Sequence, residues 1–161
     1  MTFDTTTHKC LAYWLAHTLW AFPTFVYGWV VALVMLISGH RPKSYGYSLY
    51  FETRWLKHCG FAAGPFFVLA TDSVNQSMKQ HEYGHTLQTL CWGPLALFVI
   101  TIPSIIRYHY RRFVQARMQK RLNKKKITSA EYSLWLSQFP AYDSVWFEAQ
   151  ATKLGALAFQ E

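Results

Sequence analysis

A long run without charged side chains limits what this chain can fold into. Between Cys10 and His40 there is no Asp, Glu, Lys or Arg. The run is longer than the roughly 20 residues that a helix needs to cross a bilayer and than the roughly 7 to 15 apolar residues of a signal peptide. We therefore expect residues 1–40 to form an N-terminal transmembrane helix that stays in the mature protein. Pro23 is expected to kink this helix or to divide it into two pieces.

The composition agrees with a chain that partly contacts lipid. Hydrophobic residues make up 52% and charged residues only 15% of the 161 residues, which is more apolar than an ordinary soluble domain. This length suits one domain and excludes a second catalytic domain. Residues 41–161 are expected to form that domain, associated with the membrane. The segment 93–106 is uncharged but short and contains Pro103, so it is expected to be re-entrant or a short span.

Positive charge is concentrated in one segment. Nine of the sixteen Lys and Arg residues lie between Arg107 and Lys126, where there is no acid. Such a segment suits nucleic acid or the anionic face of a membrane. We expect membrane lipids and no nucleic acid, because the segment directly follows apolar residues and no nucleic-acid-binding motif is present. By the positive-inside rule, this side of the domain faces the cytoplasm.

The central part of the chain predicts one buried segment and one helix. Residues 61–70 read FAAGPFFVLA, which is typical of a buried strand or a membrane-dipping piece. Asp72 or Ser73 is expected to cap the following helix. That helix is expected to end at Gly93 and Pro94.

Two further helices are expected towards the C-terminus. Thr128 and Glu131 have the spacing of a capping box, so a helix should begin there and end at Pro140. Asp143 or Ser144 is expected to cap the last helix. The fold class that follows is mainly α.

The motif that carries chemistry lies in the central helix. His81, Glu82 and His85 form the pattern HExxH. Residues i and i+4 lie on one face of a helix, so both imidazoles can reach one metal ion. Glu82, one position along, can approach a water molecule on that metal.

A metal ion held by this motif needs a third ligand. The chain has only eight acids, and Glu148 has the best context among the others, on an amphipathic helix beside Ala149 and Ala151. The three cysteines are far apart and form no CxxC motif, so neither a disulfide framework nor a cysteine zinc site is expected.

Two sequence elements, HEYGHTLQ and the later WFEAQATKLGA, resemble those of small gluzincin metallopeptidases. The HtpX-like and CaaX-prenyl-protease-like membrane peptidases and a group of short bacterial membrane proteins with HEYGH are similar. The resemblance implies a minimal zincin-like core with one zinc ion, held by His81, His85 and Glu148. It also implies a membrane-bound peptidase that hydrolyses peptide or protein substrates with a zinc-activated water, Glu82 being the general base. The implied location is a bacterial-type inner (cytoplasmic) membrane, with the site on the cytoplasmic side.

The chain departs from the gluzincin pattern at one position. Thr152 stands where an aspartate usually orients a ligand histidine. Such outer partners tune metal affinity or rate by roughly 10- to 100-fold, so Thr152 is expected to contact a ligand without supplying charge. The segment Phe66–Ala70 is expected to offer an edge strand to the substrate backbone. Candidate donors to the oxyanion are His109, Tyr110, Tyr132 and Tyr142.

Two alternative functions stay open at this stage. The first is a non-catalytic structural or accessory subunit of a membrane protein complex that keeps a zincin-like fold; Thr152 and the small size favour it. The second is a membrane di-iron enzyme, since Glu82 and His85 also form E-x-x-H. Two irons need more ligands than this motif offers, and no second E-x-x-H is present.

Overall fold

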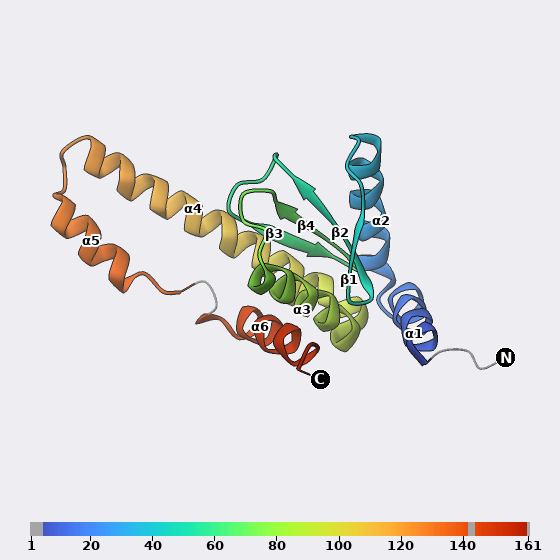
Figure 1. Cartoon of the computed structure of the whole chain (residues 1–161). Helices are drawn as coiled ribbons and strands as arrows, with labels where there is room; N and C mark the ends of the chain where they lie inside the picture. The colour runs from blue at the N-terminus through green and yellow to red at the C-terminus, as the bar shows by residue number, and fades with distance from the viewer. Residues whose placement is uncertain (1–4, 142–143, 161) are drawn as a thin grey trace.

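The fold is mainly helical, with one small sheet (Figure 1). The computed structural model describes residues 5–141 and 144–160. The helices are α1 (Thr5–Leu19), α2 (Phe22–Ile37), α3 (Gln76–Trp92), α4 (Ile102–Asn123), α5 (Ser129–Gln138) and α6 (Trp146–Leu157). The strands are β1 (Lys43–Tyr45), β2 (Ser48–Thr53), β3 (Gly60–Ala63) and β4 (Phe66–Ala70). A short 3₁₀ helix, η1 (Gly93–Leu95), and a short π-helix, η2 (Leu97–Thr101), join α3 to α4.

The uncharged N-terminal run forms two helices instead of one. The axes of α1 and α2 are bent by 104°. Pro23 lies in the first turn of α2, where its missing N–H and its ring prevent a continuous helix from passing. Across the described residues, no one helix has both the length and the apolar composition to cross a membrane. Two bent pairs, 7–19 with 22–37 and 76–95 with 97–123, have them only when taken together.

The sheet has the strand order β1-β2-β4-β3. β2 and β4 are parallel, while β1 and β3 each pair antiparallel with a neighbour. The prediction that Phe66–Ala70 forms an edge strand was wrong, because this strand is β4 and pairs on both sides. Its five consecutive buried residues suit a central strand covered on both faces. The edge next to β4 belongs to β3.

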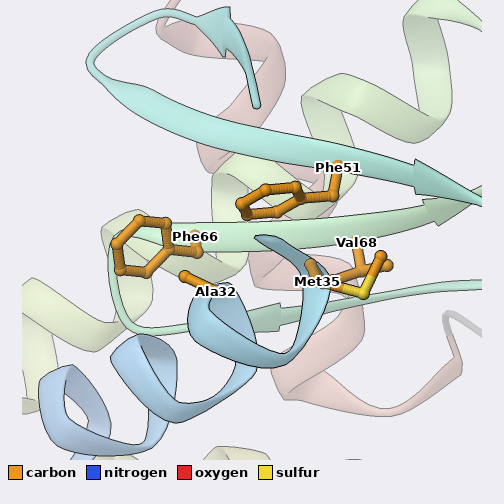
Figure 2. Close-up of a cluster of buried hydrophobic side chains, with 5 residues drawn as sticks. All are labelled: Ala32, Met35, Phe51, Phe66 and Val68. Atoms are coloured by element: carbon orange, nitrogen blue, oxygen red, sulfur yellow. The ribbon is translucent and has the colours of Figure 1, made fainter. Parts of the chain in front are cut away.

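One face of the sheet packs against α2. Alternate residues of a strand point to opposite faces, so Phe66 and Val68 of β4 share this face with Phe51 of β2. Figure 2 shows these side chains meeting Ala32 and Met35 of α2. All five are almost completely buried. This cluster fixes α2 to the sheet.

The other face of the sheet packs against α3. Phe67 and Leu69 of β4 meet Tyr50 of β2 and Tyr83 of α3 in a second buried cluster. The Tyr50 and Phe67 rings stack with centroids 5.1 Å apart. The sheet therefore lies between α2 and α3, and Tyr83, inside the HExxH motif, anchors that motif to the sheet.

The helix α3 begins and ends at residues with a clear role in capping. Its N-cap is Asn75, whose side chain accepts a hydrogen bond from the Met78 amide at 2.8 Å. The prediction that Asp72 or Ser73 caps this helix was wrong. Asp72 instead accepts a hydrogen bond from the His58 amide, and the Ser73 hydroxyl donates to Asp72. The helix ends at Gly93 as expected, with a positive φ of 53°.

The helices α3 and α6 cross at very short distance. A Cβ atom added to Gly84 of α3 would lie 2.6 Å from the carbonyl carbon of Ala151. A Cβ added to Gly155 of α6 would lie 2.5 Å from that of Gln80. Two glycines, one on each helix, thus bring the HExxH helix and the last helix together.

The helices α4 and α5 form an arm, residues 102–138, that extends away from the sheet (Figure 1). The segment 93–106 leads through η1 and η2 directly into α4, with Pro103 in the first turn of that helix. The capping box of Thr128 and Glu131 at the start of α5 is confirmed. The prediction that Ser144 caps α6 was wrong, because the residue before Trp146 is Val145 and no side chain caps this helix. Asp143, the other predicted cap, lies outside the described residues.

Candidate metal centre

Two neighbouring helices bring His81, His85 and Glu148 to one point. Nε2 of His85 lies 3.1 Å from Oε2 of Glu148, and Nε2 of His81 lies 3.3 Å from the same oxygen. The ligand atoms of the three residues all lie within 4.8 Å of one another. The imidazoles come from α3 and the carboxylate from α6. This group could hold a metal ion.

Thr152 fixes the ring of His81 from the far side. Its hydroxyl oxygen lies 2.9 Å from Nδ1 of His81 and 3.2 Å from the carbonyl oxygen of Glu148. The carbonyl can only accept, so the hydroxyl donates to it and accepts from the Nδ1–H of His81. Thr152, one turn beyond Glu148, therefore contacts a candidate ligand as the sequence suggested.

Gln88 fixes the ring of His85 through a hydrogen bond at Nδ1. Its Oε1 lies 2.8 Å from Nδ1 of His85, while its Nε2 donates to the carbonyl of Phe147 at 2.6 Å and to Oε1 of Gln150 at 2.9 Å. Since the amide nitrogen is used as a donor twice, Oε1 is the acceptor and His85 donates through Nδ1–H. Gln88 thereby joins a candidate ligand on α3 to the backbone of α6.

The hydrogen bonds at Nδ1 of His81 and His85 favour the binding of a cation at this site. A neutral imidazole that carries its proton on Nδ1 has a lone pair on Nε2. Both Nε2 atoms point at a carboxylate oxygen, so three electron-rich atoms face one another. Two ligands at about 2.0–2.1 Å from a tetrahedral zinc ion lie about 3.3 Å apart, and the distances of 3.1 and 3.3 Å between Nε2 and Oε2 agree with that spacing. The residues present are therefore suited to holding a metal ion.

Glu148 is held as a charged group. Its side chain is fully buried, which by itself raises the pKa of the carboxyl. When no metal ion is bound, donation from protonated His81 and His85 and from Ser104 outweighs burial and holds that pKa well below its ordinary value. The Ser104 hydroxyl donates to Oε1 at 2.6 Å. Oε1 is thus occupied by Ser104, and Oε2 faces the two imidazoles.

Glu82 lies beside this group in a different environment. It is only 4% exposed, and its Oε2 has no hydrogen-bond partner. Burial raises the pKa of this carboxyl to about 7. A Cβ added to Gly60 of β3 would lie 2.7 Å from Oε1 of Glu82. Glycine at position 60 therefore lets the edge strand approach the carboxylate.

A cavity of about 330 Å³ opens in front of Glu82 and His85. One wall comes from the edge strand β3 and the residue before it, and the other from η2 and the first turns of α4. Tyr27 of α2 also lines it. Most of the residues that line the cavity are apolar. They include Leu56, Phe61, Ala62, Ile100 and Ile105.

The four candidate oxyanion donors lie in different places. His109 lines the cavity. Tyr110 is 63% exposed and is not among the lining residues, and Tyr132 lies on α5, in the arm. Tyr142 lies outside the described residues. His109 is thus the candidate that the structure brings to the site.

Sequence reasoning missed two parts of this centre. Ser104 lies in an apolar segment, and nothing in its sequence context indicates a contact with a residue so far along the chain. The approach of Gly60 depends on the order of strands in the sheet, which the sequence did not predict. Gln88, one turn after His85 on the same helix, contacts both His85 and Phe147.

No family model, curated protein or solved structure matches this chain. The function must therefore be inferred from the chemistry of the side chains themselves. Among residues 5–141 and 144–160, one group of three or more His, Cys, Asp or Glu side chains is close enough to hold a metal ion. A di-iron centre needs further ligands, which that part of the chain does not bring to this group.

Proposed function

We propose that this chain is a membrane-bound zinc metallopeptidase that hydrolyses peptide bonds. The observation that carries the proposal is the meeting of two imidazole nitrogens and one carboxylate oxygen beside a cavity that a second carboxylate, that of Glu82, also faces. Three protein ligands and an adjacent open space are typical of catalytic zinc sites, whereas structural zinc sites have four protein ligands.

Zinc is the metal that this donor set favours. Two imidazoles and one carboxylate form a borderline set that suits a tetrahedral d¹⁰ ion. When bound, zinc would supply a Lewis acid that polarises a carbonyl and lowers the pKa of water. His81, His85 and Glu148 would hold it, and Thr152, Gln88 and Ser104 would orient these three side chains.

Glu82 is the proposed general base and acid. Efficient proton transfer needs a group whose pKa lies near the working pH, and burial brings the pKa of Glu82 to about 7. Its unpartnered Oε2 is free to accept a proton from the attacking water. The same oxygen would then return this proton to the leaving amine.

The edge strand β3 and the cavity are the proposed binding site for the substrate peptide. In the sheet as described, β3 pairs only with β4, so its other edge can pair with an extended substrate backbone. The apolar walls, including Phe61 and Ile105, favour a large apolar side chain next to the cleaved bond. His109, at the cavity wall, is the proposed donor to the oxyanion.

The membrane location is proposed from the exposed surface. Large apolar side chains are exposed along α1 and α2, such as Leu19 and Leu33, and again on the segment from Leu95 to Ile106. Exposed apolar surface of this extent marks contact with lipid or with other proteins. With the basic arm on the cytoplasmic side, as the positive-inside rule favours, the site faces the cytoplasm of a bacterial-type inner membrane.

A non-catalytic accessory subunit is the second proposal. Thr152 favours it, because a neutral hydroxyl at Nδ1 of His81 adds no charge to the imidazole. This role requires the fold and the metal but not the proton chemistry of Glu82. The two proposals therefore differ in what Glu82 is needed for.

The experiment compares metal content with hydrolysis in matched variants. Wild type should bind about one zinc per chain and cleave extended peptides that carry Leu or Phe at the bond. Glu82→Gln has nearly the same shape, so it should keep the zinc while hydrolysis falls by about 10²- to 10⁴-fold. His85→Ala should lose both. Zinc without cleavage in wild type would support the accessory subunit, and unchanged cleavage by Glu82→Gln would refute its role as the base.

A further inference from the structure

The entire net charge of the chain lies on the arm. The chain has a formal net charge of +8. The arm, residues 102–138, carries nine Lys and Arg residues and one acid, Glu131, while the rest of the chain has seven cations and seven acids. A surface that is so strongly basic, next to a balanced body, is suited to an anionic partner.

The arm also has no core of its own. None of the residues of α4 or α5 is buried. Phe113 on α4 is 64% exposed, and Leu134 and Leu136 on α5 are 60% and 45% exposed. A helix pair normally buries its apolar side chains against another layer, so these side chains are left for a partner outside the chain.

Eight of the nine cations of the arm fall into two groups, and the ninth, Arg112, donates to the hydroxyl of Tyr108 at 2.7 Å. Near the body, Arg107 donates to the carbonyl of Ala141 at 2.8 Å, and Arg111 donates to the carbonyl of Pro140. These two side chains hold the segment that leads to α6. The distal cations form no ion pair with any acid in the described part of the chain. They are Arg117, Lys120, Arg121, Lys124, Lys125 and Lys126.

We propose that the arm lies on an anionic phospholipid surface. The distal cations would contact the headgroups, while Phe113, Leu134 and Leu136 would enter the interface between headgroups and acyl chains. Exposed apolar side chains beside the cations favour lipid over nucleic acid, whose phosphates offer them no apolar contact. Phe98, just before the arm, and Ile106, in the first turns of α4, are exposed apolar residues, which places the base of the arm beside the proposed membrane contact.

The test uses the full chain in lipid nanodiscs, which expose both membrane faces. One set of nanodiscs contains only phosphatidylcholine and the other also contains phosphatidylglycerol. Limited trypsin cleavage followed by mass spectrometry gives a rate at each site. Cleavage after Arg117 and Arg121 should slow at least about 10-fold in the anionic nanodiscs, since each cation near an anionic surface contributes up to about fivefold in binding. Cleavage after Lys57 and Lys153, outside the arm, should not slow, and added salt should remove the protection.

Two variants with equal loss of charge complete the test. Replacing Lys124, Lys125 and Lys126 by Gln should weaken the arm's binding by up to about 100-fold and abolish the protection after Arg117. Replacing Lys9, Lys43 and Arg54 by Gln removes three cations outside the arm and should leave the protection intact. Equal cleavage rates in both kinds of nanodisc would overturn the proposal. So would protection by added nucleic acid in neutral nanodiscs without protection by phosphatidylglycerol.

Discussion

The contact between α3 and α6 gives the sharpest test of the metal centre, through the variant Gly84→Ala. The added Cβ would lie 2.6 Å from the carbonyl carbon of Ala151, whereas ordinary van der Waals contact begins at 3.4 Å. The carbonyl oxygen of Ala151 would lie closer still, so relieving the overlap requires α6 to move away from α3 by more than about 1 Å. Glu148 moves with α6, while His81 and His85 stay on α3. Metal–ligand distances tolerate changes of only about 0.2 Å, so the three ligands would no longer fit one zinc ion.

Two opposing effects determine how much Gly84→Ala should change the free energy of unfolding. Overpacking of a tight contact costs about 1–3 kcal/mol, and replacing glycine by alanine inside a helix returns up to about 1 kcal/mol. We expect a net loss of about 1–2 kcal/mol in the free energy of unfolding. For a chain of this size that loss lowers the midpoint of thermal unfolding by about 2–8 °C. Zinc affinity, measured by competition with a chromophoric chelator, should fall by at least about 10-fold.

The matched control for Gly84→Ala is Ser77→Ala on the exposed side of the same helix. A surface substitution of this kind changes stability by no more than about 0.5 kcal/mol. If Gly84→Ala unfolds at the wild-type midpoint and binds zinc as tightly as wild type, the two helices do not approach as closely as the structure has them. The convergence of the three ligands would then lose its physical basis.

Three further predictions concern the same centre. Thr152→Val removes the acceptor for Nδ1 of His81 and should weaken zinc binding by about 10-fold, whereas Thr152→Asp, which accepts the same bond with a charge, should strengthen it; chelator competition measures both. Gln88→Leu leaves Nδ1 of His85 without an acceptor and should weaken zinc binding by about 10- to 100-fold, with Gln76→Leu on the exposed first turn of α3 as the control. Zinc at 100 times its Kd should stabilise wild type by about 2.7 kcal/mol in thermal unfolding, and an equal effect on His85→Ala would contradict the assigned ligands.

The sequence predicted the parts of the molecule that depend on local signals. Three such signals are the HExxH spacing, the stop at Gly93 and the capping box of Thr128 and Glu131. Each signal is encoded by residues only a few positions apart, and the structure has the helix features that they predict. Glu148 was predicted from its context and from a resemblance. The structure places it beside both histidines.

Features that depend on contacts far apart in the chain could not be predicted in the same way. The four-stranded sheet is built from short segments, of which only the most apolar, Phe66–Ala70, has a clear pattern. Its position in the centre of the sheet depends on pairing with β2 and β3, which no local pattern encodes. The bend at Pro23 was one of two alternatives, because a proline can kink a helix or end it, and packing against the sheet decides which.

The burial of Glu82 bears on the choice between an enzyme and an accessory subunit. A subunit that only needs a bound metal gains nothing from this side chain, which is not one of the three candidate ligands. Burying a carboxyl with one unpartnered oxygen costs about 1–3 kcal/mol, and any side chain at position 60 would displace Oε1 from its present place beside β3. Two destabilising features, the orphaned oxygen and a glycine inside a strand, thus meet at one carboxyl beside the cavity. Such a cost is expected where the group takes part in chemistry. Glu82→Leu should therefore raise the free energy of unfolding under both proposals. In an enzyme the same variant should also abolish hydrolysis.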